Sequence, residues 1–405
     1  MRILVVSQCY WPDTASVAQH LGDLCQELSE SDHKVRVFTS RFSYEDKSIK
    51  YPKVENHNGI FIRRLYHTHF GKKTIIGRAI DFISFNFSAL FPLLLMETNQ
   101  TDAIIAMPPP PLLPFIGAFI AKIKGIPFIY WAMDLQPELS YSTGLLREGS
   151  IVGKILNKLT QYTIRNSERI IVLDDDMKNY LIKRGGNRNK IFSVPVWPVM
   201  TKYYDGDRLS NPFRVQNKFK DKTVVMYSGN YGNAHPIDTL LEAAFQLRKE
   251  SSILFVFVGG GTQYSKVAYY RKELNCANII QLPYQPKEYI HISLASADFH
   301  VVVLNKKTVG FTHPNKIYGA MYVSRPIIFI GPKKSYAGKI LRDNPSNLSF
   351  QEGQSIELAE AIRHSSTNLE SFVVVGERNR DYVQKYYNAN RLKAEMINIF
   401  MSIKK

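Results

Sequence analysis

A cluster of residues able to bind an anion occupies positions 311 to 321, in the order Phe-Thr-His-Pro-Asn-Lys-Ile-Tyr-Gly-Ala-Met. Lys316 stands at the start of a predicted helix, where its charge opposes the helix dipole at a cost of roughly a few tenths of a kcal/mol. That placement suits a lysine that shares a bound anion with the N–H groups of the helix. The alternative is a solvated lysine of the first helical turn, since Lys306 and Lys307 show that lysines are common nearby. The predicted phosphate-binding residues of this cluster are Pro314, Asn315, Lys316 and Tyr318.

Two glycine-containing turns precede this cluster, and each follows a predicted buried strand. The first is Ser228-Gly229-Asn230-Tyr231-Gly232-Asn233, after a strand at 223–228, and the second is Gly259-Gly260-Gly261, after a strand at 253–258. Glycine lets backbone N–H groups approach a phosphate closely, and asparagine adds side-chain donors. Plain turns that pack a helix on a strand are the alternative. Neither Gly-x-Gly-x-x-Gly nor a Gly-Lys-Ser/Thr sequence occurs, which disfavours NAD and P-loop ATP chemistry. The candidate contacts are Gly229, Asn230, Asn233, Gly260, Gly261 and Tyr284.

Two carboxylates four positions apart, Asp134 and Glu138, follow a predicted buried strand at 128–132. At the carboxyl end of a strand such groups can orient a hydroxyl group or take its proton. The same residues can equally cap a helix, because an aspartate before Pro137 and Glu138 is typical of a helix N-terminus. Both interpretations stay open from the sequence.

The composition indicates a globular protein with an anionic partner. Hydrophobic residues make up 45% of the 405 residues, which excludes collagen-like and wholly disordered chains. Lys and Arg number 52 against 35 Asp and Glu, so the net charge is +17, and nucleic acid, a phospholipid surface or a phosphorylated substrate could bind. The cysteines, Cys9, Cys25 and Cys276, form no Cys-x-x-Cys pair, so neither a zinc site nor a disulfide framework is expected. We expect a cytoplasmic protein, because the first apolar run is too short for a signal peptide.

A basic stretch directly precedes an apolar, Phe-rich segment at 82–95. This pairing predicts a peripheral contact with anionic lipid through residues 47–96, at the inner face of the cell membrane. A core helix beside a solvated basic face is the alternative. Asp81 and Asn86 interrupt the apolar stretch, so we expect it to be buried or interfacial and not to span the bilayer. The basic residues are Lys47, Lys50, Lys53, Arg63, Arg64, Lys72, Lys73 and Arg78.

Strands and helices alternate in both halves of the chain, which predicts an α/β fold with two doubly wound parallel sheets. The stretch at 194–221 is rich in proline and charge and lacks periodicity, so it is the expected linker. We therefore predict an N-terminal domain at 1–200 and a C-terminal domain at 201–384, with a last helix at about 385–405 packing back on the first. Ligands of such sheets bind beyond the carboxyl ends of the strands, here in a cleft between facing domains.

Together these residues resemble the retaining glycosyltransferases of family 4, in particular the subgroup acting on bacterial surface polysaccharides and O antigens. The resemblance implies the GT-B architecture, with a nucleotide-sugar donor bound by the C-terminal Rossmann-like domain and an acceptor by the N-terminal one. It also implies no metal and no cofactor, because positive groups and helix N-termini neutralise the leaving diphosphate of the donor substrate. The motifs are Tyr10-Trp11-Pro12, Pro108-Pro109-Pro110, Asp134-Leu135-Gln136-Pro137-Glu138, Tyr227-Ser228-Gly229-Asn230, Gly259-Gly260-Gly261, Ala297-Asp298 and Pro314-Asn315-Lys316.

The chain departs from the family pattern at several positions. Phe311 and Gly319 stand where many members have two glutamates, and Asn230 and His235 stand where they have an arginine and a lysine. We expect Lys316, with His313 or Arg325, to supply the positive charge instead. The usual glycine-rich loop after the first strand is replaced by Asp13-Thr14-Ala15-Ser16. The acceptor contacts are predicted to be Asp13, Ser16, Asp134 and Glu138.

The leading hypothesis is a membrane-associated hexosyltransferase that moves a sugar from a UDP-linked donor to a lipid-linked or saccharide acceptor, with retention. Lys316 and the turns at Gly229 and Gly260 would hold the leaving diphosphate, and Asp134 would orient the acceptor. Gly319 and Asn230 motivate one alternative, a noncatalytic scaffold that binds a nucleotide sugar. A nucleotide-sugar epimerase, which forms product without an acceptor, is another. Nucleic-acid binding ranks last, because no recognition motif accompanies the positive charge.

Overall fold

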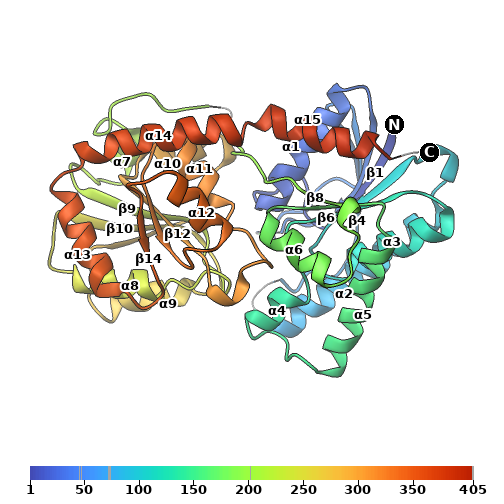
Figure 1. Ribbon diagram of the computed structural model, residues 1–405, viewed down its shortest axis with the longest axis horizontal. Helices are drawn as coiled ribbons and strands as arrows, with labels where there is room; N and C mark the ends of the chain where they lie inside the picture. The colour runs from blue at the N-terminus through green and yellow to red at the C-terminus, as the bar shows by residue number, and fades with distance from the viewer. Residues whose placement is uncertain (45, 47, 72–73, 201, 404–405) are drawn as a thin grey trace. The chain divides into compact units, whose positions relative to one another are not determined.

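The computed structural model describes residues 1–44, 46, 48–71, 74–200 and 202–403 (Figure 1). Contacts between residues divide the chain into two compact units. Unit 1 comprises Met1–Val196, Gly310–Thr312 and Asn390–Lys405, and unit 2 comprises Trp197–Val309 and His313–Ala389. The first segment of unit 1 ends at Val196, whereas the sequence predicted a domain boundary at residue 200.

Unit 1 is built on an eight-stranded sheet in the order β3-β4-β2-β1-β5-β6-β7-β8. Its pairings are parallel except at one edge, where β3 runs antiparallel to β4, a departure from the predicted all-parallel sheet. The central strands are short apolar runs buried on both faces, as expected of strands covered by helices on both sides. The strands are β1 (Arg2–Val6), β2 (Lys34–Ser40), β3 (Val54–His57), β4 (Ile60–Leu65), β5 (Ala103–Ala106), β6 (Phe128–Ala132), β7 (Arg169–Val172) and β8 (Ile191–Ser193).

Side-chain caps fix where several helices of unit 1 begin. Ser150 accepts a hydrogen bond from Gly153 N at the start of α5, and Asp174 does the same for Met177 N at α6. The C-terminal α15 is tied to this unit by the ion pair of Lys393 with Glu27, at 2.6 Å. The helices are α1 (Ser16–Glu30), α2 (Ile75–Leu95), α3 (Leu113–Lys124), α4 (Glu138–Ser142), α5 (Ile151–Asn166), α6 (Asp175–Lys183) and α15 (Ala389–Met401), with 3-10 turns η1 (Thr98–Gln100) and η2 (Arg188–Lys190).

Unit 2 is built on a six-stranded parallel sheet in the order β11-β10-β9-β12-β13-β14. Alternate residues of β9 enter two separate apolar clusters, with Val225 and Tyr227 in one and Val224 and Met226 in the other. The sheet is therefore packed on both faces, since successive side chains of a strand point to opposite sides. The strands are β9 (Thr223–Asn230), β10 (Ile253–Gly260), β11 (Ile279–Leu282), β12 (Phe299–Val303), β13 (Ile327–Ile330) and β14 (Leu348–Phe350).

The helices of unit 2 cover both faces of this sheet (Figure 1). They are α7 (Pro212–Gln216), α8 (Asp238–Gln246), α9 (Tyr264–Lys272), α10 (Ile290–Ala295), α11 (Lys316–Tyr322), α12 (Tyr336–Asp343), α13 (Ser355–Ser366) and α14 (Glu370–Tyr386), with 3-10 turns η3 (Lys287–Tyr289) and η4 (Lys306–Thr308). The strand order reverses direction between β1 and β5 in unit 1 and between β9 and β12 in unit 2. Ligands of open α/β sheets bind at such switch points, beyond the carboxyl ends of the strands.

The apolar segment at 80–96 forms part of one continuous helix, α2. Asp81 and Asn86 do not interrupt it, because both side chains are turned inward and buried. Within the described part of the chain, one helix, α2, is long and apolar enough to cross a membrane, judged by length and composition alone. Only 33% of its apolar stretch is buried inside the protein. Of the basic residues predicted to flank it, Lys47, Lys72 and Lys73 lie outside the described residues.

Candidate functional site

The candidate donor site lies in unit 2, where β9 and β10 end side by side. Their pairing continues to the last residues, with Gly259 opposite Gly229, so the glycines belong to the strand ends and not to separate turns. Lys316 is the first residue of α11, as the sequence predicted. Its Nζ lies 3.8 Å from the place that a Cβ at Gly229 would occupy. The structure thus brings the lysine and the first glycine segment together at the switch point.

The ammonium group of Lys316 is sealed from solvent and, among the described residues, its Nζ has no hydrogen-bond partner. It lies over the aromatic ring of Tyr227, 3.4 Å from the centroid. Burial lowers the pKa of Lys316 well below the ordinary 10.5, because a cation is poorly solvated there. A phosphate oxygen would accept a hydrogen bond from this Nζ and favour its charged form. These features are those of a candidate anion site.

His235 does not add a second positive charge beside Lys316. Its Nδ1 donates a hydrogen bond to the carbonyl of Val303, at 2.8 Å, where β12 ends. Burial, and then the nearby Lys316, lower the pKa of His235 to about 3. The ring is therefore neutral at physiological pH, and its Nε2 is an acceptor.

The two residues expected to assist Lys316 are engaged within unit 2. His313 is buried, and its Nε2 lies 2.8 Å from the hydroxyl of Tyr318. Arg325 is also largely buried, and its guanidinium donates to the carbonyl of Ala295, at 2.6 Å. Both side chains are held by contacts within unit 2, whereas Lys316 Nζ has no hydrogen-bond partner among the described residues.

The glycines with positive φ angles in the two segments have different surroundings. Gly259 and Gly261 have positive φ angles of 120° and 142°, and a Cβ on either would sit 2.4 Å from Gly229 O or Asn230 Oδ1, respectively. Close packing between the two strand ends therefore requires them. Gly229 also has a positive φ, of 116°, yet a Cβ there would meet only Lys316. Gly229 is thus the glycine that leaves the backbone open toward the ammonium.

The remaining predicted donor contacts, Asn233, Tyr284 and Asn230, have different surroundings. Asn233 Oδ1 accepts a hydrogen bond from Thr262 at 2.9 Å, which ties the two loops together. Tyr284 is 37% exposed and lies against Gly260, whose carbonyl its hydroxyl contacts at 3.4 Å. Asn230 is exposed at the strand end. These positions remain able to meet a nucleotide.

The helix α11 presents most of its side chains to the interior. Tyr318 is fully buried, with its ring 4.4 Å from that of Tyr387, so it serves the core instead of lining a surface site. Pro314 is buried and Asn315 is the N-cap residue, so of this motif Lys316 carries the chemistry. A Cβ at Gly319 would approach Met200 Cε at 3.3 Å, so a carboxylate at this position would face apolar side chains.

In unit 1, the two predicted carboxylates have different surroundings. Asp134 Oδ1 accepts a hydrogen bond from Thr312 Oγ1, at 2.6 Å, and the residue is half-buried after β6. It does not cap α4, whose N-cap residue is Pro137. Glu138 is buried and accepts from the hydroxyl of Tyr180, at 3.0 Å. With Arg184 3.5 Å away, Glu138 is committed to packing within unit 1.

The predicted acceptor contacts after β1 are also placed by the structure. Asp13 is buried, and its Oδ1 accepts from Tyr44 N at 3.0 Å and from the Tyr51 hydroxyl at 3.1 Å. It therefore anchors the segment around Tyr44. Ser16 is exposed at the first residue of α1. Neither residue lines a cavity with Asp134 or Glu138 among those described.

A small, partly open cavity lies at the carboxyl ends of β1 and β2, and the sequence analysis missed it. Gln8 lines it, is only 6% exposed, and has an amide Oε1 with no hydrogen-bond partner among the described residues. His67 lies beside it, and burial lowers its pKa to about 4, so its ring is neutral. The position of Gln8, directly after the switch strand β1, is the signal that could have found it.

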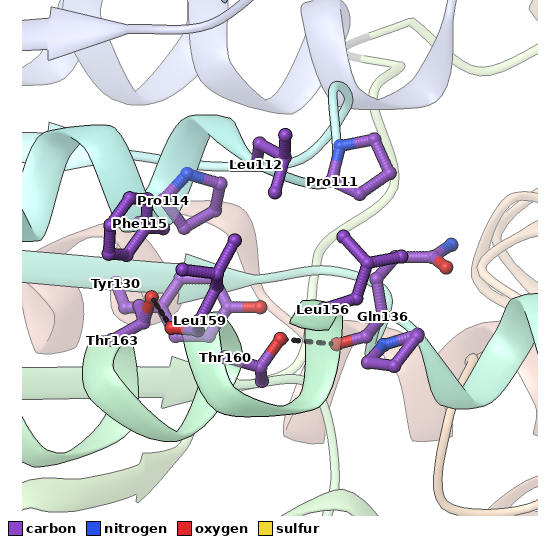
Figure 2. Close-up of a pocket in the computed structure, with 11 residues that line it drawn as sticks. Pro111, Leu112, Pro114, Phe115, Tyr130, Gln136, Leu156, Leu159, Thr160 and Thr163 are labelled. Carbon is purple, nitrogen blue, oxygen red and sulfur yellow. Dashed lines mark hydrogen bonds between the residues drawn. The ribbon is translucent and has the colours of Figure 1, made fainter. Parts of the chain in front are cut away.

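A second cavity, shown in Figure 2, lies between α3 and α5. Its walls are mainly apolar, with Phe115 and Leu159 among them. The hydroxyl of Thr160 donates to the carbonyl of Gln136 at 3.1 Å, and that of Thr163 to Leu159 O at 3.0 Å (Figure 2). Because these hydroxyls are already used, the cavity has the character of a packing gap beside the Asp134 motif.

Comparison with known proteins decides which family this site belongs to. Residues 16–197 match the Glycosyl transferase 4-like domain, and residues 210–393 match Glycosyl transferases group 1. The chain belongs to the group 1 glycosyltransferase family. It is a glycosyltransferase, and its resemblance to family 4 is confirmed. Among the described residues no three His, Cys, Asp or Glu side chains are grouped to hold a metal ion.

Relatives of this glycosyltransferase span its whole length. It is 22% identical to the putative colanic acid biosynthesis glycosyl transferase WcaI of Escherichia coli, over 98% of this chain and 99% of the relative. Sucrose-phosphate synthase from Thermosynechococcus elongatus has a TM-score of 0.75 at 15% identity, covering 98% of each chain. HepE of Anabaena in complex with UDP-glucose has a TM-score of 0.72 at 14% identity, covering 99% of each chain. At these identities the two structures establish the fold, which is the predicted architecture of two α/β domains.

Proposed function

We propose that this glycosyltransferase moves a sugar from a UDP-linked donor to a lipid-linked or saccharide acceptor during synthesis of a surface polysaccharide. Unit 2 binds the donor, and unit 1 binds the acceptor. One observation carries the proposal, the buried Nζ of Lys316, which has no hydrogen-bond partner among the described residues and lies beside Gly229. The UDP-glucose bound by HepE and the colanic acid role named for WcaI support the choice of donor and pathway.

In this proposal Lys316 acts on the leaving diphosphate. As the bond between the anomeric carbon and the phosphate oxygen breaks, negative charge develops on the diphosphate, and a preorganised cation stabilises it. The acceptor oxygen forms the new bond on the same face of the sugar, and its proton passes to the leaving phosphate oxygen. Asp134, fixed by its hydrogen bond with Thr312, orients the acceptor hydroxyl and forms no covalent bond.

For the acceptor, the unit 1 cavity extends the set of contacts predicted from the sequence. The Gln8 amide and the side chains around it offer hydrogen-bonding groups to a polar head such as a sugar. Asp13 supports the rim of this cavity indirectly, because it binds the N–H of Tyr44, which lines it. We assign acceptor recognition to this cavity together with Asp134.

The test begins with a thermal-shift screen against uridine, guanosine, adenosine and thymidine nucleotides. A nucleotide present at about 100 times its dissociation constant should stabilise the protein by about 2.7 kcal/mol. We expect UDP to give the largest shift. Radiolabelled UDP-sugars are then incubated with and without saccharide and polyprenyl-linked acceptors, and product should form only with an acceptor. Product without any acceptor would indicate epimerisation, and UDP binding without transfer to any acceptor would indicate a scaffold.

A further inference from the structure

The outward face of α2 is apolar along its whole length. Six side chains at spacings of three and four residues are between 41% and 75% exposed, and we call them the α2 stripe. Phe87 and Phe91 are the aromatic residues of the stripe, and their side chains are 70% and 66% exposed. The members of the α2 stripe are Ile76, Ile80, Ile83, Phe87, Phe91 and Leu94.

Two polar residues of the same helix, Asp81 and Asn86, are buried on its inward side. Asp81 is buried and accepts hydrogen bonds from the N–H groups of Phe70 and Gly71, at 2.9 and 2.7 Å. Asn86 is buried on the same side, beside Phe85. A surface helix of a protein in water has the reverse arrangement, with polar residues outward. We therefore expect the outward face of α2 to contact a partner less polar than water.

Two neighbouring helices extend this apolar surface. α3 packs against both α2 and α5, and the three helices lie together in unit 1 (Figure 1). Phe119 and Ile123 are exposed on α3, and Ile151, Val152 and Ile155 are exposed on α5. Exposed apolar side chains gathered on three neighbouring helices indicate an interaction site.

Positive charge accompanies the apolar residues. The three helices contain one acidic residue, the inward-facing Asp81. Lipid headgroups of negative charge are the complementary partner of such a surface. The basic residues of the three helices are Arg78, Lys122, Lys124, Lys154, Lys158 and Arg165.

We propose that the α2 stripe, with the exposed apolar residues of α3 and α5, docks unit 1 on the surface of an anionic phospholipid bilayer. The opposite face of α2 packs into unit 1, with Phe85 and Ala89 fully buried, so the helix lies in the plane of the interface and does not cross it. A second copy of the chain fits this surface less well, because a two-fold contact would bring the basic residues of the three helices close to those of the other copy.

Docking also specifies the kind of acceptor, a step that rests on the proposed glycosyl transfer. Arg78, Asp81 and Phe82 belong to the first turns of α2 and also line the unit 1 cavity. An acceptor whose apolar tail stays in the bilayer would therefore present its polar head at this cavity, where the buried Gln8 Oε1 has no hydrogen-bond partner within the described part of the chain. The acceptor is a lipid-linked saccharide, not a free one.

The docking step is tested by flotation of the full chain with vesicles of phosphatidylglycerol and phosphatidylcholine, and with phosphatidylcholine alone. The wild type should float with the anionic vesicles, and less so at high salt. The double variant Phe87→Glu, Phe91→Glu should reduce the bound fraction by roughly tenfold or more, because two exposed apolar contacts are replaced by repelled charges. The matched control is Val373→Glu, Val374→Glu on α14, which changes two exposed apolar residues of unit 2 and should float like the wild type.

UDP affinity is measured on the same samples, so that the two proposals fail separately. If the wild type binds UDP but does not float, the docking proposal alone is overturned. If it floats but does not bind UDP, only the donor assignment is overturned. A dimer that Phe87→Glu, Phe91→Glu dissociates, without flotation, would make a second copy the occupant and refute the bilayer.

The acceptor step is tested with radiolabelled UDP-sugars and vesicles made from bacterial membrane lipid. Label should enter the solvent-extractable lipid, and Phe87→Glu, Phe91→Glu should lower this incorporation in proportion to its loss of flotation. Incorporation only into water-soluble saccharide, at a rate independent of vesicles, would refute a lipid-linked acceptor.

Discussion

Replacement of Lys316 is the perturbation whose outcome depends most on the structure. In Lys316→Ala the diphosphate loses one charge-assisted hydrogen bond, worth about 1.5 to 3 kcal/mol. At about 1.4 kcal/mol per tenfold, the dissociation constant for UDP should rise by roughly 10- to 100-fold. Isothermal titration calorimetry measures this directly. The matched control is Lys307→Ala, an exposed lysine of η4 in the same unit, which should leave UDP affinity unchanged.

The lowered pKa of Lys316 gives this prediction a second, independent part. Burial lowers the pKa of Lys316 in the free protein, so between that pKa and the ordinary 10.5 the unfolded chain binds more protons than the folded one. The contribution of Lys316 to stability therefore rises with pH across this window, and Lys316→Met should abolish the rise and be more stable at neutral pH.

UDP should change the pH dependence in the opposite direction. A bound diphosphate raises the pKa of Lys316, so binding takes up a proton, and UDP affinity should fall as the pH rises through the same alkaline window. Lys316→Arg keeps its charge at these pH values and should show no such fall. Unchanged UDP affinity in Lys316→Ala, or identical pH profiles for wild type and Lys316→Arg, would refute the reasoning.

The other predictions concern single positions in each unit. Gly229→Ala should destabilise the protein by about 1–3 kcal/mol in chemical denaturation, because φ is positive there, and should also weaken UDP binding; an unchanged midpoint would count against it. Asp134→Asn should lower turnover by about 100-fold while UDP affinity is kept, and a parallel loss of both would contradict a role in orienting the acceptor. Glu138→Gln should cost about 1–3 kcal/mol of stability by weakening its contact with Tyr180, with the acceptor KM unchanged in the folded variant. Gln8→Ala should raise the acceptor KM at constant UDP affinity, and a normal KM would remove the cavity from the site.

The sequence predicted the fold well because its signals are local and repeated. Short β-branched runs separated by helical periodicity define parallel sheets, and the runs at 3–6 and 223–228 became the switch strands β1 and β9. The edge strands β3, β8 and β14 were missed because they are not buried apolar runs, and most of their residues are half-buried or exposed. Their existence depends on pairing with a neighbour that is distant in sequence.

The candidate site was only partly accessible to sequence reasoning. Lys316 was identified because its position at a helix start is a local feature. Gly261 was predicted to contact the donor and Glu138 the acceptor. Their packing contacts could not be predicted, because what a Cβ or a carboxylate meets depends on segments brought together by folding. The inward turn of Asp81 was likewise hidden, since the sequence shows a charge in an apolar helix but not the N–H groups that bind it.

A crystal structure with UDP tests most directly whether unit 2 binds the diphosphate of a nucleotide sugar at the ends of β9 and β12. We expect a phosphate oxygen within hydrogen-bond distance of Lys316 Nζ and next to the backbone of Gly229. UDP bound elsewhere on the chain, with Lys316 still lying over Tyr227 and no phosphate beside it, would show that unit 2 does not bind the donor in this way.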